Sequence, residues 1–113
     1  MTVTLYHNPQ CSNSRRALEV IRARGIEPEI VEYLKAPLSR AALAGLMARL
    51  GVPVRAVMRT KDEAYGALNL ADADDDALLD AIAAHPVLLN RPIVVSDKGA
   101  RLCRPGDLAA DLL

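Results

Sequence analysis

The sequence predicts a small mixed α/β domain with the element order β-α-β, several helices, then β-β-α. Two observations lead to this prediction. A strand–helix–strand pattern within Val3–Tyr33 implies a parallel pair of strands. A hairpin centred on Asp97-Lys98-Gly99, followed by one more helix, ends the chain. With 113 residues, 51% of them apolar, we expect a single domain, 1–113, that buries a core without disulfides.

The first unit begins with Val3–Tyr6, whose β-branched and aromatic residues favour a strand. A helix is predicted over Ser14–Arg24, because its apolar residues share one face and Gly25 suits a helix end. Ser12 or Ser14 is the predicted N-cap of that helix. The alternating segment Glu29–Tyr33 is the second predicted strand.

The middle of the chain predicts a helical insertion over about residues 37–86. Its clearest helix opens at Pro37-Leu38-Ser39 and ends at Gly51, with leucine and methionine at i, i+3, i+4 and i+7. A loop and a short helix are expected over Arg55–Leu70. The acidic run Asp74-Asp75-Asp76 then precedes a helix that ends at His85-Pro86, and favourable charge at a helix N-terminus accounts for the run.

The last segment predicts strands over Pro92–Ser96 and Arg101–Cys103, on either side of the hairpin turn. Pro105 suits the first turn of a closing helix that extends through Leu112.

Composition excludes several classes of function. Lysine plus arginine and aspartate plus glutamate each number 14, so no net field attracts nucleic acid or an anionic membrane. No segment approaches the roughly 18 to 20 apolar residues of a membrane span, and the N-terminus lacks the pattern of a signal peptide. With two cysteines only, we expect a protein of the reducing cytoplasm. The balanced charge and short apolar faces favour a monomer.

The segment YHNPQCSNSRR, from Tyr6 to Arg16, places Cys11 at the predicted N-terminus of a helix. The N–H groups and dipole there lower a thiol pKa from about 8.5 into the range of roughly 3.5 to 7.5, and they also bind oxyanions. Ser14 replaces the second cysteine of a CxxC pair. A second thiol must therefore come from glutathione, from a partner protein or from Cys103, which is more typical of a core-edge residue.

Four pieces of the chain stand out when taken together: HNPQCSNSR, Arg59 in MRTKDEAY, Arg91 in LLNRPIVV and Arg104 in RLCRPGDL. In this order they resemble the glutaredoxin-coupled arsenate reductases, which have a thioredoxin-like fold. The resemblance implies that Cys11 is the nucleophile and that the three arginines, with Ser14, surround the oxyanion. It also implies that His7 assists the thiolate, as an imidazolium would, and that Pro92 is a cis-proline facing the cysteine.

The reaction implied by the resemblance is the reduction of arsenate to arsenite through a covalent adduct on Cys11. Glutathione acts as co-substrate and glutaredoxin as the final reductant, with no metal and no bound cofactor. One departure separates this chain from the family pattern: Ser12-Asn13 stands where well-studied members carry Gly-Thr. This departure resembles a sister subgroup, and it bears on the substrate rather than on the fold or the thiol.

Two other functions stay open at this point. The chain could be a glutathione-dependent thiol oxidoreductase with a different substrate. It could also be a redox-sensing regulator that binds RNA polymerase, although such regulators carry a CxxC switch and Ser14 counts against that function. An iron–sulfur cluster of the kind that monothiol glutaredoxins hold is a further alternative.

Overall fold

The computed structural model describes all 113 residues. The chain divides into two compact units, one formed by Met1–Ala36 with Arg91–Leu113 and the other by Pro37–Asn90. The second unit contains the segment predicted as a helical insertion and extends to Asn90.

The first unit is built on a four-stranded sheet with the strand order β2-β1-β3-β4. β1 pairs in parallel with β2 and antiparallel with β3, and β3 pairs antiparallel with β4. The strands are Thr4–Tyr6 (β1), Glu29–Val31 (β2), Ile93–Ser96 (β3) and Gly99–Leu102 (β4). This mixed sheet, with its parallel pair and its closing hairpin, confirms the predicted thioredoxin-like fold.

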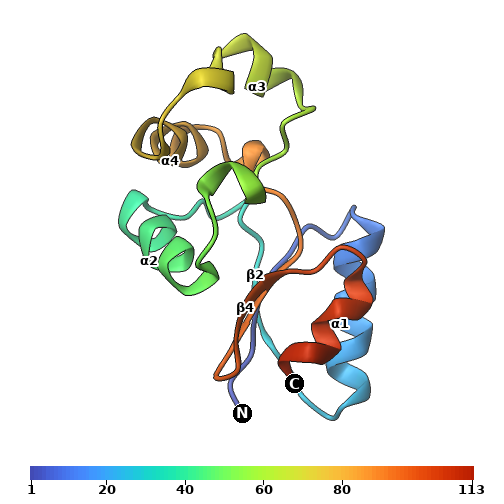
Figure 1. The fold of residues 1–113 in the computed structure, drawn as a ribbon. Helices are drawn as coiled ribbons and strands as arrows, with labels where there is room; N and C mark the ends of the chain where they lie inside the picture. The colour runs from blue at the N-terminus through green and yellow to red at the C-terminus, as the bar shows by residue number, and fades with distance from the viewer. The chain divides into compact units, whose positions relative to one another are not determined.

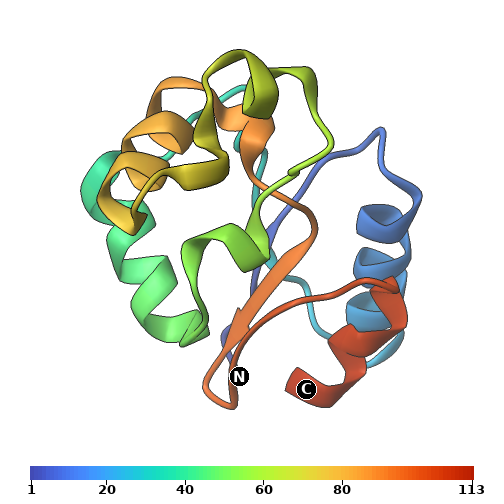
Figure 2. The ribbon, with the colours of Figure 1, turned by 45° about the horizontal axis from the view of Figure 1, so that its top comes forward.

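Two helices pack side by side in the first unit (Figures 1 and 2). They are α1, Ser12–Ala23, and the 3₁₀ helix η4, Gly106–Leu112. Their apolar residues and those of the sheet form one core, in which Leu5, Val94, Ile21 and Ala109 are fully buried. The α1–η4 pair thereby fixes the first turn of α1 relative to the sheet.

Three sequence-based boundaries are wrong. Cys11, with extended backbone angles, is the N-cap of α1, so neither Ser12 nor Ser14 holds that position. β2 ends at Val31, because a turn forms from Glu32, whose carbonyl accepts the N–H of Lys35 at 2.9 Å. In the hairpin Ser96 pairs directly with Gly99, so β4 begins at Gly99 rather than at Arg101. The predicted closing helix is present, with 3₁₀ geometry.

The second unit is helical. Its elements are α2 (Arg40–Leu50), η1 (Val54–Val57), α3 (Glu63–Ala67), η2 (Leu70–Asp72), α4 (Asp75–Ala84) and η3 (Pro86–Leu88). Gly51 ends α2 in a left-handed conformation, as predicted.

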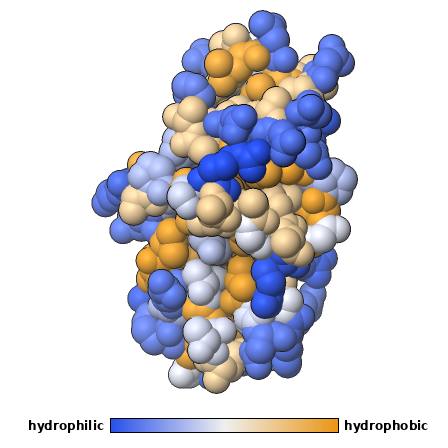
Figure 3. All heavy atoms as spheres, turned by 90° about the vertical axis from the view of Figure 1, so that its left-hand side faces the viewer, coloured by the Kyte–Doolittle hydropathy of each residue, from blue (hydrophilic) through white to orange (hydrophobic).

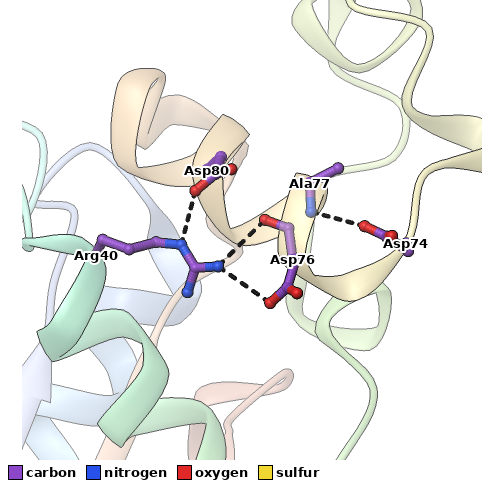
Figure 4. A network of polar contacts seen from close by, with 5 residues as sticks. All are labelled: Arg40, Asp74, Asp76, Ala77 and Asp80. Atoms are coloured by element: carbon purple, nitrogen blue, oxygen red, sulfur yellow. Dashed lines mark hydrogen bonds and ion pairs between the residues drawn. The ribbon is translucent and has the colours of Figure 1, made fainter.

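The acidic run caps α4 and also anchors α2 (Figure 4). Asp74 accepts a hydrogen bond from the Ala77 N–H at 2.9 Å, which is a normal N-cap contact. Arg40 donates to Asp80 at 2.7 Å and to the Asp76 carboxylate at 3.1 Å. These contacts confirm that the acidic run serves a helix N-terminus.

No helix of the structure is long and apolar enough to cross a membrane. On the face shown in Figure 3, hydrophilic and hydrophobic residues are interleaved.

Gly106→Ala tests the contact between η4 and α1. A Cβ at this position would lie 2.7 Å from the backbone nitrogen of Ala17 and closer still to the carbonyl oxygen of Asn13. Because backbone atoms cannot move aside cheaply, we expect a loss of about 1–3 kcal/mol in the free energy of unfolding, measured by urea denaturation.

Gly45→Ala is the control for this prediction. Gly45 lies within α2, and a Cβ there meets nothing within 4 Å. Helix propensity predicts that this variant gains up to about 1 kcal/mol. Equal stability of the two variants would contradict the tight packing of Gly106.

Candidate active site

Cys11 lies at the junction of β1 and α1, with a side chain that is almost completely buried. Its own N–H donates to the Asn8 carbonyl at 3.0 Å, which closes the loop before α1. Burial is the largest single effect on the Cys11 pKa and raises it. The N–H groups of Ser14 and Asn13 and the Arg91 guanidinium together outweigh burial, so the pKa is lowered from its usual value. The site therefore favours a thiolate.

Two arginines converge on the sulfur because of the β3–β4 register. Ile93 pairs with Leu102 in the sheet. At the next position of the register, the Cys103 N–H donates to the Pro92 carbonyl at 2.9 Å. One further step along the same register places Arg91 opposite Arg104. The hairpin thus brings together two cations that are distant in the sequence.

The two arginines contact different groups around Cys11. Arg91 is half-buried, and both its hydrogen bond and its charge lower the pKa of Cys11. Arg104 donates from Nη1 to the Arg91 carbonyl at 2.8 Å, and the same nitrogen lies 3.8 Å from Cys11 Sγ. The long Nη1–Sγ distance explains why Arg91, rather than Arg104, dominates the side-chain effect on the thiol. Arg104 is exposed.

His7 and Ser14 form a buried pair behind the loop. His7 Nδ1 lies 3.0 Å from Ser14 Oγ, and the Asn8 N–H donates to the same oxygen at 3.0 Å. Ser14 Oγ accepts the Asn8 N–H, and which partner donates in the His7–Ser14 contact depends on the tautomer of the ring.

The pKa of His7 bears on the role expected for this residue, which stays a prediction. Burial lowers the pKa of His7, and the opposing effect of the Glu32 carboxylate is smaller. The ring is therefore neutral at neutral pH and supplies no positive charge to the thiolate. Ser14, which is fully buried, holds the first turn of α1 against the loop. Its hydroxyl is directed to His7 and Asn8, and its backbone N–H serves the sulfur.

The remaining predicted residues lie as follows. The Arg91–Pro92 peptide bond is cis, as is the Arg104–Pro105 bond. Arg59 belongs to the second unit. Its guanidinium forms an ion pair with Asp62 at 3.3 Å, and its backbone N–H donates to the Leu88 carbonyl. Its part in oxyanion binding stays a prediction.

Cys103 has the character of a core residue. It is fully buried in the core cluster, and burial raises its pKa to about 11. Such a thiol is un-ionised at neutral pH. No group of three or more histidine, cysteine, aspartate or glutamate side chains is arranged to hold a metal ion.

Sequence reasoning missed the structural roles of Asn8, Asn13 and Gly106. Asn8 Oδ1 accepts the N–H of Gln10 at 3.0 Å, a local turn that the Asn-Pro pair could have indicated. Asn13 Oδ1 accepts the Gly106 N–H at 3.3 Å, so the Asn13 side chain ties α1 to η4. No local signal marks this second contact, because the partners are far apart in the chain.

Comparison with known proteins agrees with this geometry. The ArsC family matches residues 6–111. The chain belongs to the ArsC family. An arsenate reductase of Rhizobium meliloti (strain 1021) is 50% identical over 115 residues, which span 100% of this chain and 82% of that protein. An arsenate reductase of Escherichia coli (strain K12) is 47% identical over 113 residues, or 98% of this chain and 80% of the relative.

A solved ArsC-family structure is also similar. The arsenate reductase from Vibrio cholerae has a TM-score of 0.95 and 45% sequence identity, covering 100% of this chain and 98% of that chain. The likeness extends over both units of the ArsC-family chain described here.

Alkylation should separate the two thiols. At neutral pH we expect iodoacetamide to modify Cys11 rapidly and Cys103 only after unfolding, as read by intact-protein mass spectrometry. Because the Cys11 pKa is lowered, its alkylation rate should reach half-maximum at a lower pH than that of a cysteine in the urea-unfolded chain. A midpoint at or above the unfolded value would contradict the thiolate site.

A double-mutant cycle tests whether His7 acts through Ser14. Ser14→Ala leaves the Asn8 N–H without its acceptor and should cost about 1–3 kcal/mol in unfolding free energy. Both Ser14→Ala and His7→Phe should raise the pH midpoint of Cys11 alkylation. The double variant should shift it no further than the larger single shift. Additive shifts would indicate that His7 acts on the sulfur directly.

Proposed function

We propose that this protein reduces arsenate to arsenite, with Cys11 as the nucleophile. The observation that carries the proposal is the convergence of two N–H groups and Arg91 on the Cys11 sulfur, with Arg104 beside it. Membership of the ArsC family and the similarity to arsenate reductases along the whole chain support the choice of substrate.

The first step is attack of the Cys11 thiolate on arsenic(V). A sulfur–arsenic bond forms, and an arsenate oxygen leaves as water after it takes up protons. The thiolate and arsenate are both anions, so cations must offset their repulsion. Arg91 lies at the sulfur, and the planar fork of Arg104 suits an oxyanion in bidentate fashion. Ser14 contributes its backbone N–H, which stabilises the thiolate before attack.

The reducing electrons come from two further thiols. Glutathione displaces a second oxygen as water and forms its own sulfur–arsenic bond. A glutaredoxin thiolate then attacks the glutathione sulfur, and the electron pair of that sulfur–arsenic bond remains on arsenic, which becomes arsenic(III). Glutaredoxin leaves as the mixed disulfide with glutathione. Hydrolysis of the remaining bond releases arsenite and the Cys11 thiol. The burial of Cys103 supports external thiols as the source of electrons.

The proposal includes the cellular setting. We propose a monomer of the reducing cytoplasm, with Cys11 the reactive thiol and no resident metal or organic cofactor required by any step.

A coupled assay tests the proposal directly. Purified protein is combined with arsenate, glutathione, glutaredoxin, glutathione reductase and NADPH, and NADPH consumption and arsenite release are followed. We expect turnover that needs arsenate and glutaredoxin and that is lost in Cys11→Ser, because a serine hydroxyl is not ionised at neutral pH. Retained activity in Cys11→Ser would remove Cys11 as nucleophile. Rapid alkylation of Cys11 without arsenate-dependent turnover would indicate another substrate.

Single arginine variants should separate binding of the oxyanion from stabilisation of the Cys11 thiolate. Arg104→Ala should lower kcat/KM for arsenate by about 10- to 100-fold, the value of a lost charge-assisted hydrogen bond, with little change in alkylation by neutral iodoacetamide. Arg91→Ala should lower both rates, because Arg91 also acts on the thiol pKa. Arg24→Ala is the matched control, because Arg24 is exposed and lies at the far end of α1.

A fall in the alkylation rate of Cys11 with Arg104→Ala would assign that arginine to the thiol instead. Arg59→Ala, assayed in the same way, tests the prediction for Arg59.

A further inference from the structure

A cavity of about 230 Å³ lies next to the Cys11 loop and has no part in the arsenate chemistry described above. The loop residues His7–Gln10 form one side. Glu32, Leu34 and Lys35, which follow β2, form the other. Because β1 and β2 are parallel, both groups leave the sheet at the same edge, which is where ligands bind in open α/β sheets. The arginines follow β4 or precede β3, so they belong to different strands from those that frame the cavity.

The charges on the cavity are of both signs. The Lys35 ammonium lies 3.5 Å from the Glu32 carboxylate, and Lys35 is largely exposed. Glu32 would repel an inorganic oxyanion, and no arginine lines this cavity. An amino-acid head group carries an ammonium and a carboxylate on one carbon, and it can pair with both side chains at once.

His7 adds a polar group to the cavity wall. Its Nδ1 is hydrogen-bonded to Ser14, so Nε2 is the ring nitrogen left for the cavity that His7 lines. The exposed Leu34 adds an apolar side chain to the lining. A polar ring nitrogen, a charge pair and an apolar side chain suit the end of a small peptide.

The size and place of the cavity limit how such a peptide binds. It is smaller than the roughly 300 Å³ of the smallest sites for drug-sized ligands, so it accommodates one end of a tripeptide rather than the whole molecule. Gln10 lines the cavity and is joined directly to Cys11. A peptide whose end is bound in the cavity therefore lies beside the Cys11 loop.

We propose that this cavity binds the γ-glutamyl end of glutathione, with Lys35 and Glu32 pairing its carboxylate and ammonium. The inference rests on the proposed function, in which glutathione is the second thiol. It assigns the binding of the peptide thiol to the β1–β2 edge and the binding of the oxyanion to the β3–β4 hairpin.

Lys35→Glu tests the site by kinetics, with Arg24→Glu as control. Both substitutions change the net charge by the same amount at exposed positions, so long-range attraction of the anionic peptide is matched. We expect Lys35→Glu to raise KM for glutathione about 5- to 10-fold relative to Arg24→Glu, with KM for arsenate and for glutaredoxin unchanged. Equal KM values for glutathione in the two variants would overturn the proposal. A rise confined to the glutaredoxin KM would also overturn it and would assign the surface to that protein.

A binding measurement separates this proposal from the proposed function. The wild-type protein is titrated with S-methylglutathione, which cannot react with Cys11, and amide shifts are followed by two-dimensional NMR. We expect shifts in His7–Gln10 and Glu32–Lys35, reduced in Lys35→Glu and absent with S-methyl-cysteinylglycine, which lacks the γ-glutamyl group. Absent shifts with S-methylglutathione would overturn the proposal whatever the assay gives. Shifts without arsenate turnover would support the binding site and count against arsenate as the substrate.

Discussion

The first turn of α1 must be held against the loop that precedes it, and the chemistry at Cys11 depends on this contact. Ser14 provides it: its buried hydroxyl oxygen accepts the Asn8 N–H and pairs with His7. From the other side, Gly106 packs so closely on α1 that a methyl group would not fit. With both constraints in place, the N–H groups of Asn13 and Ser14 are directed at the sulfur.

Several hydrogen bonds and one charge together stabilise the Cys11 thiolate by more than burial destabilises it. Burial of Cys11 opposes ionisation more than any single contact favours it, and the helix N–H groups with Arg91 reverse the balance. Burial is still useful, because the same low dielectric strengthens each hydrogen bond to the sulfur. Cys103 is more deeply buried than Cys11, and there burial exceeds the favourable contacts and raises the pKa to about 11.

The contacts of Asn13 bear on the departure from the family pattern at Ser12-Asn13. Asn13 turns its side-chain oxygen to the Gly106 N–H, and Ser12 is exposed. The side chain of Asn13 is therefore used in joining α1 to η4, and only its backbone N–H faces the sulfur. Ser12, which stands where well-studied members carry glycine, is exposed, so its side chain is compatible with the thiolate site. Whether the pair marks a separate subgroup stays a prediction.

The sequence by itself determined the element order, the position of Cys11 at a helix start, and the two arginines that precede prolines, because these depend on local periodicity and turn chemistry. It also placed Cys103 correctly in the core. Only the tertiary structure decided which groups meet. The pairing of Ser96 with Gly99 sets a register that brings Arg91 opposite Arg104, and a shift of one residue would have separated them. Burial turned His7 into a neutral partner of Ser14. Register and burial arise from contacts between distant residues, so no local pattern could specify them.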